Sequence, residues 1–276
     1  MEVNPELIQP EDWLRPNAKG RAVPVFLIHD GGGTTFSYHC LDPLSRPVYG
    51  IHNPHFRNGA VFEGGIPQMG SLYAGFIKTA IADPDFPSKR NPDGSVDILI
   101  GGWSMGGLLS LEVARQLAED CSVRIIGILM IDSVYPIRSS TGPSVAAVDT
   151  SEEGKSKNQI LSQRAMTEAR RMIKTWDLPV WEGRLAGRRP PIAMLRAKEY
   201  VPTEGDRVSL VDTYRLDRNL GWDRYEEGLL TEVRDIEGHH FDIFAFKRIP
   251  EITKTIKKGL DTLEMRASAL YQRKAV

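Results

Sequence analysis

The chain has 276 residues, of which 41% are hydrophobic and 26% are charged, proportions that are ordinary for a globular protein and exclude a disordered one. Its 35 basic and 36 acidic residues give a net charge of -1, so no overall field draws it to nucleic acid or to anionic membranes. No stretch approaches the roughly 18 consecutive apolar residues of a membrane span.

The N-terminal segment 1–19 is polar and contains three prolines, which is not the pattern of a signal peptide. The chain has two cysteines, Cys40 and Cys121, and neither has a CxxC partner or the spacing of zinc ligands. Two cysteines in a chain of this length indicate reduced thiols. We therefore expect a cytoplasmic protein.

The first half of the chain alternates strand and helix patterns. Residues 23–28 form a short apolar run that stops at Asp30 and three glycines, as a buried strand does where it enters a tight loop. Residues 47–51 predict a second short strand, and residues 69–81 predict a helix.

The alternation continues through the middle of the chain. Residues 96–100 predict an apolar strand that ends at two glycines, and residues 108–118 carry leucine and alanine near helical spacing. Residues 124–131 predict a further buried strand that ends at Asp132. Continuous apolar strands alternating with helices indicate the α/β class, with a mostly parallel sheet covered by helices on both faces.

The pattern changes after Pro136. Residues 139–157 are rich in Ser, Thr, Gly and Glu, and residues 158–176 predict an amphipathic helix with many basic side chains. The segment 136–189 therefore reads as an insertion that is too short and too polar to fold alone. We expect residues 1–276 to form a single domain.

The sheet is predicted to resume after the insertion. Residues 191–195 and 231–236 have the pattern of two more buried strands. Residues 242–265 are mostly helical in pattern, and Pro250 is expected to interrupt that helix.

The motif Gly102-Trp103-Ser104-Met105-Gly106 joins the strand 96–100 to the helix that follows it. A strand that turns directly into a helix leaves little room, and glycines two positions on either side of the serine let the backbone pass close to its neighbours. The serine is then held on a sharp elbow with its hydroxyl exposed above the sheet. Ser104 is the candidate nucleophile, and an ordinary glycine-rich turn is the alternative.

A nucleophile of this type needs a histidine base late in the chain, after the last strand of the sheet. The sequence Gly238-His239-His240-Phe241 follows the strand 231–236 and has that position. We assign His240 as the base, because the residue directly before the bulky Phe241 fits the pattern better. His239 is the alternative.

An acid is needed to orient the histidine. Asp132 follows the strand 124–131, and the carboxyl ends of parallel strands form the edge at which active sites lie in open α/β sheets. Serine, acid and histidine then occur in the chain order expected of a nucleophile elbow. The competing acids follow the next strand, and they are Glu199, Glu204 and Asp206.

The loop His29-Asp30-Gly31-Gly32-Gly33 can aim a backbone N–H at a developing oxyanion, and the N–H of Met105 would be the second donor. A phosphate-binding role is disfavoured, because the loop lacks GxGxxG and a Walker lysine. His52 and His55 could form a metal pair, but no neighbouring Asp, Glu or Cys completes a ligand set, so no metal site is expected.

The chain resembles the thioesterase family of α/β-hydrolases, the releasing domains and discrete enzymes of polyketide and non-ribosomal peptide synthesis, especially the fungal ones. The resemblance runs from about residue 23 to residue 244 and rests on the stretches "VPVFLIHDGGGTTFSYHCL", "RPVYGIHNP", "ILIGGWSMGGLLSLEVARQL", "IIGILMIDSVYP", "NLGWDRYEEGL" and "IEGHHFDIF". The serine elbow is shared by all α/β-hydrolases. The acid directly after its strand in "LMIDS" is more discriminating, because many lipases place it one strand later.

The resemblance implies Ser104 as nucleophile, His240 as base, Asp132 as the acid that orients it, and Gly31 with Met105 as oxyanion donors. Many members have a proline before the glycine loop where this chain reads "IHDGGG", which leaves the first donor open between Asp30 and Gly31. The insertion 136–189 would be a helical lid over the acyl pocket.

The activity implied is transfer of an acyl chain from a phosphopantetheine thioester to the serine, followed by hydrolysis or cyclisation, without a metal or other cofactor. The implied partner is an acyl carrier protein or a synthase, and the chain is either a free-standing enzyme or a single domain. Three alternatives keep the same residues: a carboxylesterase or lactonase, an enzyme that processes a released polyketide, and a non-catalytic binding protein.

Overall fold

The computed structural model describes residues 3–10, 22–136, 151–205 and 207–274. Within these ranges seven strands form one sheet in the order β1-β3-β2-β4-β5-β6-β7. The strands are β1 (Glu6–Gln9), β2 (Val25–Ile28), β3 (Val48–Ile51), β4 (Val96–Trp103), β5 (Val123–Ile131), β6 (Ile192–Ala197) and β7 (Leu230–Ile236).

The strands β2 to β7 pair in parallel, whereas β1 lies at the edge of the sheet and pairs antiparallel with β3. Residues Val25–Ile28 of β2 are fully buried, as expected for a central parallel strand that is covered on both faces. The parallel pairing brings the ends of β2, β4, β5 and β7 to the same edge, and the loops that leave those ends carry the candidate site.

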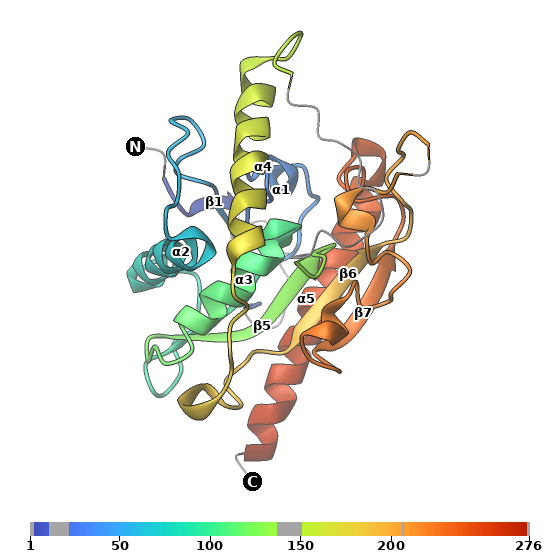
Figure 1. Ribbon diagram of the computed structural model, residues 1–276. Helices are drawn as coiled ribbons and strands as arrows, with labels where there is room; N and C mark the ends of the chain where they lie inside the picture. The colour runs from blue at the N-terminus through green and yellow to red at the C-terminus, as the bar shows by residue number, and fades with distance from the viewer. Residues whose placement is uncertain (1–2, 11–21, 137–150, 206, 275–276) are drawn as a thin grey trace.

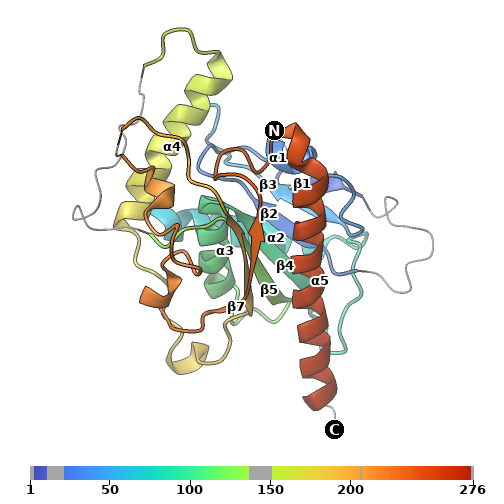
Figure 2. The same ribbon diagram turned by 90° about the vertical axis from the view of Figure 1, so that its right-hand side faces the viewer.

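Helices cover both faces of the sheet. The α-helices are α1 (Phe36–His39), α2 (Gly65–Ala82), α3 (Met105–Gln116), α4 (Lys157–Thr175) and α5 (Ile249–Lys274), and the short 3₁₀ helices are η2 (Gly183–Leu185), η3 (Leu210–Asp212), η4 (Trp222–Arg224) and η5 (Phe246–Arg248). The long helix α5 lies along one face (Figures 1 and 2), whereas α2 and α3 lie on the other, with α4 beyond them.

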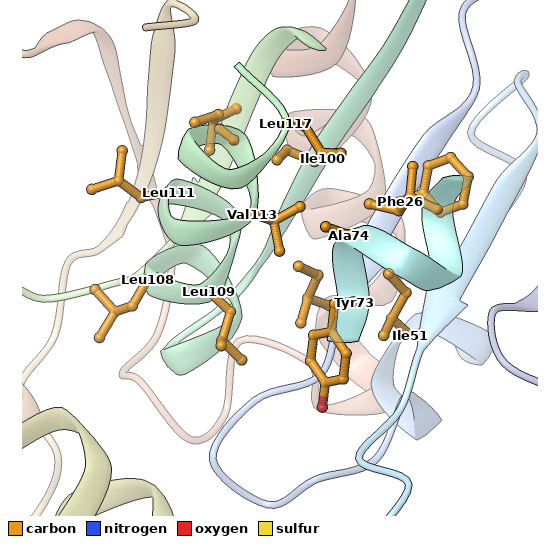
Figure 3. Close-up of a cluster of buried hydrophobic side chains, with 14 of the residues drawn as sticks. Phe26, Ile51, Tyr73, Ala74, Ile100, Leu108, Leu109, Leu111, Val113 and Leu117 are labelled. Carbon is orange, nitrogen blue, oxygen red and sulfur yellow. The ribbon is translucent and has the colours of Figure 1, made fainter. Parts of the chain in front are cut away.

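Apolar side chains fill the layer between the sheet and the two helices α2 and α3. Side chains from α2, α3 and the strands β2, β3 and β4 meet in this cluster, among them Tyr73, Val113 and Ile100 (Figure 3). A second cluster joins the opposite face of the sheet to α5 and contains Leu129, Leu195 and Leu260. The first layer packs α3 against β4, and the turn that joins these two elements lies between them in the chain.

The predicted strands and helices are confirmed, with shifts at their ends. The helix expected at residues 69–81 begins earlier, at Gly65, and the strand expected at 96–100 continues to Trp103. The prediction that Pro250 interrupts the last helix is wrong. Helix α5 begins at Ile249, so Pro250 lies in its first turn, where the missing N–H costs no helical hydrogen bond.

Two short elements, β1 and α1, carry no clear sequence signal. The strand β1 lies inside the polar N-terminal segment, and an edge strand of four residues has too few positions to show an alternation. The helix α1 has only four residues and follows the glycine loop.

The insertion between β5 and β6 contains the predicted amphipathic helix as α4. The helix starts with a capping box in which Ser156 and Gln159 satisfy each other's backbone N–H groups. Its inner face includes the buried residues Ala169 and Met172, and Ala169 lies beside Gly31 of the glycine loop. Residues 137–150 of the insertion lie outside the described residues.

Cys40 and Cys121 are both free thiols, as predicted. Within the described ranges, no helix combines the length and the apolar character needed to cross a membrane.

Candidate active site

Ser104 lies on the turn between β4 and α3, which confirms the predicted strand-turn-helix context. Its backbone has φ 56° and ψ -118°, a strained conformation for a residue with a side chain. The two flanking glycines make this turn possible. A Cβ on Gly102 would lie 2.5 Å from the carbonyl oxygen of Ile28, and one on Gly106 would lie 2.3 Å from the same atom. The elbow therefore depends on backbone packing that only glycine permits.

His240 lies in the loop after β7, and its imidazole faces the serine. Its Nε2 atom is 3.0 Å from Ser104 Oγ, and its Nδ1 atom is 2.8 Å from Asp132 Oδ2. The side chain is almost fully buried, and the ring of Trp103 lies against it with a centroid distance of 5.5 Å. These contacts hold the imidazole between a hydroxyl and a carboxylate, which is the arrangement of a general base.

Asp132 directly follows β5 and is completely buried. Its backbone also has a positive φ of 46°, and its N–H donates to the carbonyl of Leu195 at 2.7 Å. Burial acts to raise the pKa of this carboxyl group, but hydrogen bonds and charge from His240 and Arg215 outweigh burial and lower the pKa to about 2. Asp132 is therefore an anion at neutral pH and can stabilise an imidazolium.

The two predicted sources of oxyanion donors flank Ser104. Met105 is the first residue of α3, so its N–H has no partner within the helix. In the glycine loop, the N–H of Gly32 donates to Asp30 Oδ1 at 3.0 Å, and the N–H of Gly33 donates to the Asp30 carbonyl at 3.1 Å. Because these two amides are engaged within the loop, the N–H groups of Asp30 and Gly31 stay the candidates for the first donor.

His29 contacts the glycine loop and connects it to α2. Its Nδ1 atom is 2.5 Å from the Asp30 carbonyl oxygen, and its Nε2 atom is 2.6 Å from the hydroxyl of Tyr73. Burial lowers the pKa of His29 to about 4, so the ring is neutral at physiological pH. Its role is structural, through its contacts with Asp30 and Tyr73. Burial also raises the pKa of the Asp30 carboxyl group to about 6.

A cavity of about 90 Å³ opens beside Ser104 and His240. Its walls are mostly apolar and come from α3, from the loop after β5, from α4 and from η3; they include Leu108, Val134, Tyr135, Ile173, Leu210 and Val211. The sequence assigns no substrate-binding residues. The wall of this cavity has a weak sequence signal, because it is assembled from four separated segments.

The structure does not bring the alternative residues into this arrangement. His239 points to Asp242, with its Nε2 atom 4.0 Å from Asp242 Oδ2, and Glu199 accepts from the N–H of Gly238 at 3.1 Å. Asp206 lies outside the described residues.

In the parts of the chain that the structure describes, no group of three His, Cys, Asp or Glu side chains could hold a metal. Of the two histidines considered as a metal pair, His55 stacks on the ring of Phe62.

We expect His239→Ala to keep the rate of ester or thioester hydrolysis within about threefold of wild type, because its ring faces Asp242 and not Ser104. The measurement is the rate of thiol or alcohol release, with His240→Ala in parallel. A loss for His239→Ala as large as the loss for His240→Ala would reverse the assignment of the base.

One buried residue at the site has no sequence signal. Arg215 forms a bidentate ion pair with Asp132 across 83 positions of sequence. Arg215 lies in a charged segment between β6 and β7, and nothing in its local pattern distinguishes it from the exposed arginines around it.

Comparison with known proteins shows which family the chain belongs to. The thioesterase domain model matches residues 23–260. The probable thioesterase BOA10 of Botryotinia fuckeliana is 34% identical over 267 residues, which cover 95% of this chain and 91% of that protein. The nonribosomal peptide synthetase imqB of Aspergillus flavus is 30% identical over 292 residues, which cover 95% of this chain and 8% of the synthetase.

A solved structure supports the fold. The NocB thioesterase domain, in covalent complex with a fluorophosphonate nocardicin G analogue, superposes with a TM-score of 0.62. The match covers 90% of this chain and 97% of that domain at 21% identity, which shows a shared fold. The family model spans most of the chain, and the B. fuckeliana relative is 34% identical over 95% of it. The chain therefore belongs to the thioesterase family of α/β-hydrolases.

Proposed function

We propose that Ser104, His240 and Asp132 form the catalytic triad of a thioesterase that releases acyl chains from phosphopantetheine thioesters in secondary-metabolite biosynthesis. The observation that carries the proposal is the continuous chain of hydrogen bonds from Ser104 Oγ through His240 to Asp132. The strained elbow supports it, because a serine held at an unfavourable φ indicates a function for that position.

In the first step, Ser104 Oγ attacks the thioester carbonyl while His240 Nε2 takes the hydroxyl proton. The carbonyl oxygen becomes an oxyanion beside the N–H of Met105 and an N–H of the glycine loop. The tetrahedral intermediate collapses, the C–S bond breaks, and the thiol leaves with the proton from His240. An acyl-serine remains. A thiolate is a good leaving group, so its protonation matters less than it does for an amide.

In the second step, a nucleophile attacks the acyl-serine and His240 takes its proton. Water gives a free acid, and a hydroxyl, amine or carbon nucleophile of the acyl chain itself gives a ring. The serine oxygen then leaves and recovers its proton from His240. In this scheme His240 transfers each proton, and the backbone N–H groups stabilise the oxyanion. The scheme needs no cofactor.

A carrier-borne substrate is supported by the relatives. The A. flavus match is a small part of a nonribosomal peptide synthetase, so a domain of this type occurs within an assembly line. We propose an acyl carrier protein or a synthase as the partner of this chain, and the insertion that contains α4 as a lid. Ile173 of α4 lines the cavity, so movement of this helix would open it.

The test is intact-protein mass spectrometry after mixing the protein with acyl-pantetheine thioesters and with oxoesters of the same acyl groups. We expect an acyl adduct on Ser104 and faster release from thioesters. Turnover of oxoesters alone would replace the proposal with a carboxylesterase. Absence of adduct and of turnover with both would favour a binding protein or an enzyme that acts on released chains.

The cavity predicts a limit on bulk near the thioester carbonyl. A cavity of roughly 150 Å³ takes up benzene, so about 90 Å³ suits roughly three or four carbon atoms. We expect kcat/KM for benzoyl-pantetheine to be about tenfold below that for butanoyl-pantetheine. Ile173→Ala should remove most of this difference, because it enlarges the cavity.

The matched control is Ile160→Ala on the same helix, since Ile160 does not line the cavity. An equal effect of both substitutions on the benzoyl-to-butanoyl ratio would show that the cavity does not select the acyl group.

A further inference from the structure

The carboxylate of Asp132 is held by more than the histidine. Arg215 Nη1 lies 2.6 Å from Asp132 Oδ1, and Nη2 lies 2.8 Å from Oδ2. Oδ1 also accepts from the N–H of Ala197 at 2.8 Å, and Oδ2 also accepts from His240. A carboxylate has about four acceptor sites, and here each one has a donor. Asp132 therefore has a single orientation available.

Arg215 is itself fixed by its surroundings. Its side chain is 1% exposed, and its Nε atom donates to Asp212 Oδ1 at 2.9 Å. Its remaining two donors bond the carbonyls of Ala197 and Val211 at 2.9 and 3.1 Å. A guanidinium has five N–H donors, and all five are used. A buried arginine with every donor satisfied is an accurate template for a carboxylate.

The charges of this cluster balance in a particular way. A guanidinium paired with Asp132 alone would cancel the negative charge that stabilises an imidazolium. Asp212 is the second carboxylate on the same guanidinium, and it is also buried, with Oδ2 accepting from the N–H of Val201 at 2.7 Å. Asp132, Arg215 and Asp212 together carry a net charge of about -1 at neutral pH. The cluster thus keeps the charge of an unpaired aspartate while adding rigidity.

We propose that Arg215 is a positioning residue that fixes the Asp132 carboxylate for His240, and that Asp212 restores the negative charge which Arg215 would otherwise cancel. This inference rests on the proposed triad. It adds two residues that act on the reaction through Asp132 and assigns them separate tasks, orientation to Arg215 and charge to Asp212.

Other groups also act on His240, and they stay the same in every variant below. Ser104 and the ring of Trp103 face it from the elbow, and Phe241 follows it in its own loop. The Asp30 carboxylate of the glycine loop interacts with its charge. Differences between variants therefore report the cluster of Asp132, Arg215 and Asp212.

The test compares the pH profile of kcat/KM for wild type, Asp212→Asn and the double variant Asp212→Asn with Arg215→Met. In Asp212→Asn the cluster has no net charge, so imidazolium is less favoured and the acid limb should move down by about one pH unit. In the double variant Asp132 is again a lone anion, so the acid limb should return to its wild-type position. The kcat of the double variant should be about 10²-fold below that of wild type, because Asp132 has lost the two donors of Arg215.

A buried arginine elsewhere supplies the control. Arg46 is 2% exposed and pairs with Asp261 and Glu264 of α5, away from the triad. Arg46→Met should lower the melting temperature without changing the pH profile or kcat. If Asp212→Asn also lowers only the melting temperature and leaves the acid limb in place, the cluster is structural and the inference is wrong.

A second readout separates this inference from the proposed function. A fluorophosphonate labels the serine of a triad without needing a thioester, and its labelling rate should follow the same pH profiles. Wild type that is labelled but does not cleave thioesters would overturn the substrate proposal, and the displaced acid limb of Asp212→Asn would still support the inference. Labelling profiles that coincide for all variants would overturn the inference alone.

Discussion

Ser104→Ala and His240→Ala should each lower kcat for thioester hydrolysis by about 10⁴- to 10⁶-fold, and the double variant should be no slower than either single variant. The reason is that the hydroxyl and the imidazole act as one unit across their 3.0 Å contact, so removing either one removes the activated nucleophile. The residual rate would come from the oxyanion donors and from substrate binding. The measurement is thiol release at saturating acyl-pantetheine, with protein folding checked by melting temperature.

Ser110→Ala is the matched control for the serine. Ser110 is buried in α3, the helix that follows Ser104, and donates to the carbonyl of Gly106 at 2.7 Å, so its substitution tests the loss of a hydroxyl in α3 without touching the triad. We expect its kcat to stay within about threefold of wild type. Turnover by Ser104→Ala at a tenth of the wild-type rate or more would mean that the glycine-rich turn is only a structural element.

The three candidate triad residues could be placed together from the sequence because each one has a local signal. Ser104 has glycines at fixed offsets, and Asp132 and His240 directly follow strands whose apolar runs are easy to recognise. In a parallel sheet the carboxyl ends of strands lie at one edge, so three residues far apart in the chain can be placed together from the strand pattern alone. In the structure the three side chains lie together, and His240 contacts both Ser104 and Asp132 within hydrogen-bond distance.

What the sequence could not predict depends on contacts between distant segments. Arg215 meets Asp132 only because the segment after η3 returns to the end of β6 at Ala197, and no periodicity reports such a contact. The cavity beside Ser104 depends on similar contacts, since Leu108 of α3 and Ile173 of α4 both line it. The error at Pro250 has a different cause. The pattern predicts a helix from residue 242 with an interruption at Pro250, but the regular helix starts at Ile249, and proline is favourable in a first turn.

Gly106→Ala should destabilise the fold by about 2–4 kcal/mol, even though alanine is a better helix former than glycine. A Cβ at this position would lie 2.3 Å from the carbonyl oxygen of Ile28 and 2.9 Å from that of His29. Both contacts are with backbone, which cannot move aside as a flexible side chain can. The end of β2 would have to shift, and the glycine loop that begins there would shift with it. We therefore expect a loss of activity together with the loss of stability, measured by urea unfolding and by thiol release.

Gly75→Ala in α2 isolates the contribution of helix propensity. No atom lies within 4 Å of a Cβ at Gly75, so the substitution should stabilise the protein by about 0.5–1 kcal/mol and leave activity unchanged. The opposite signs expected for the two substitutions distinguish close packing at the elbow from the general cost of glycine in a helix. If Gly106→Ala were as stable and as active as Gly75→Ala, the elbow would tolerate a side chain. The close approach of β2 would then not be the cause of the turn. The strained φ of Ser104 would have to result from the sheet register and from α3 alone.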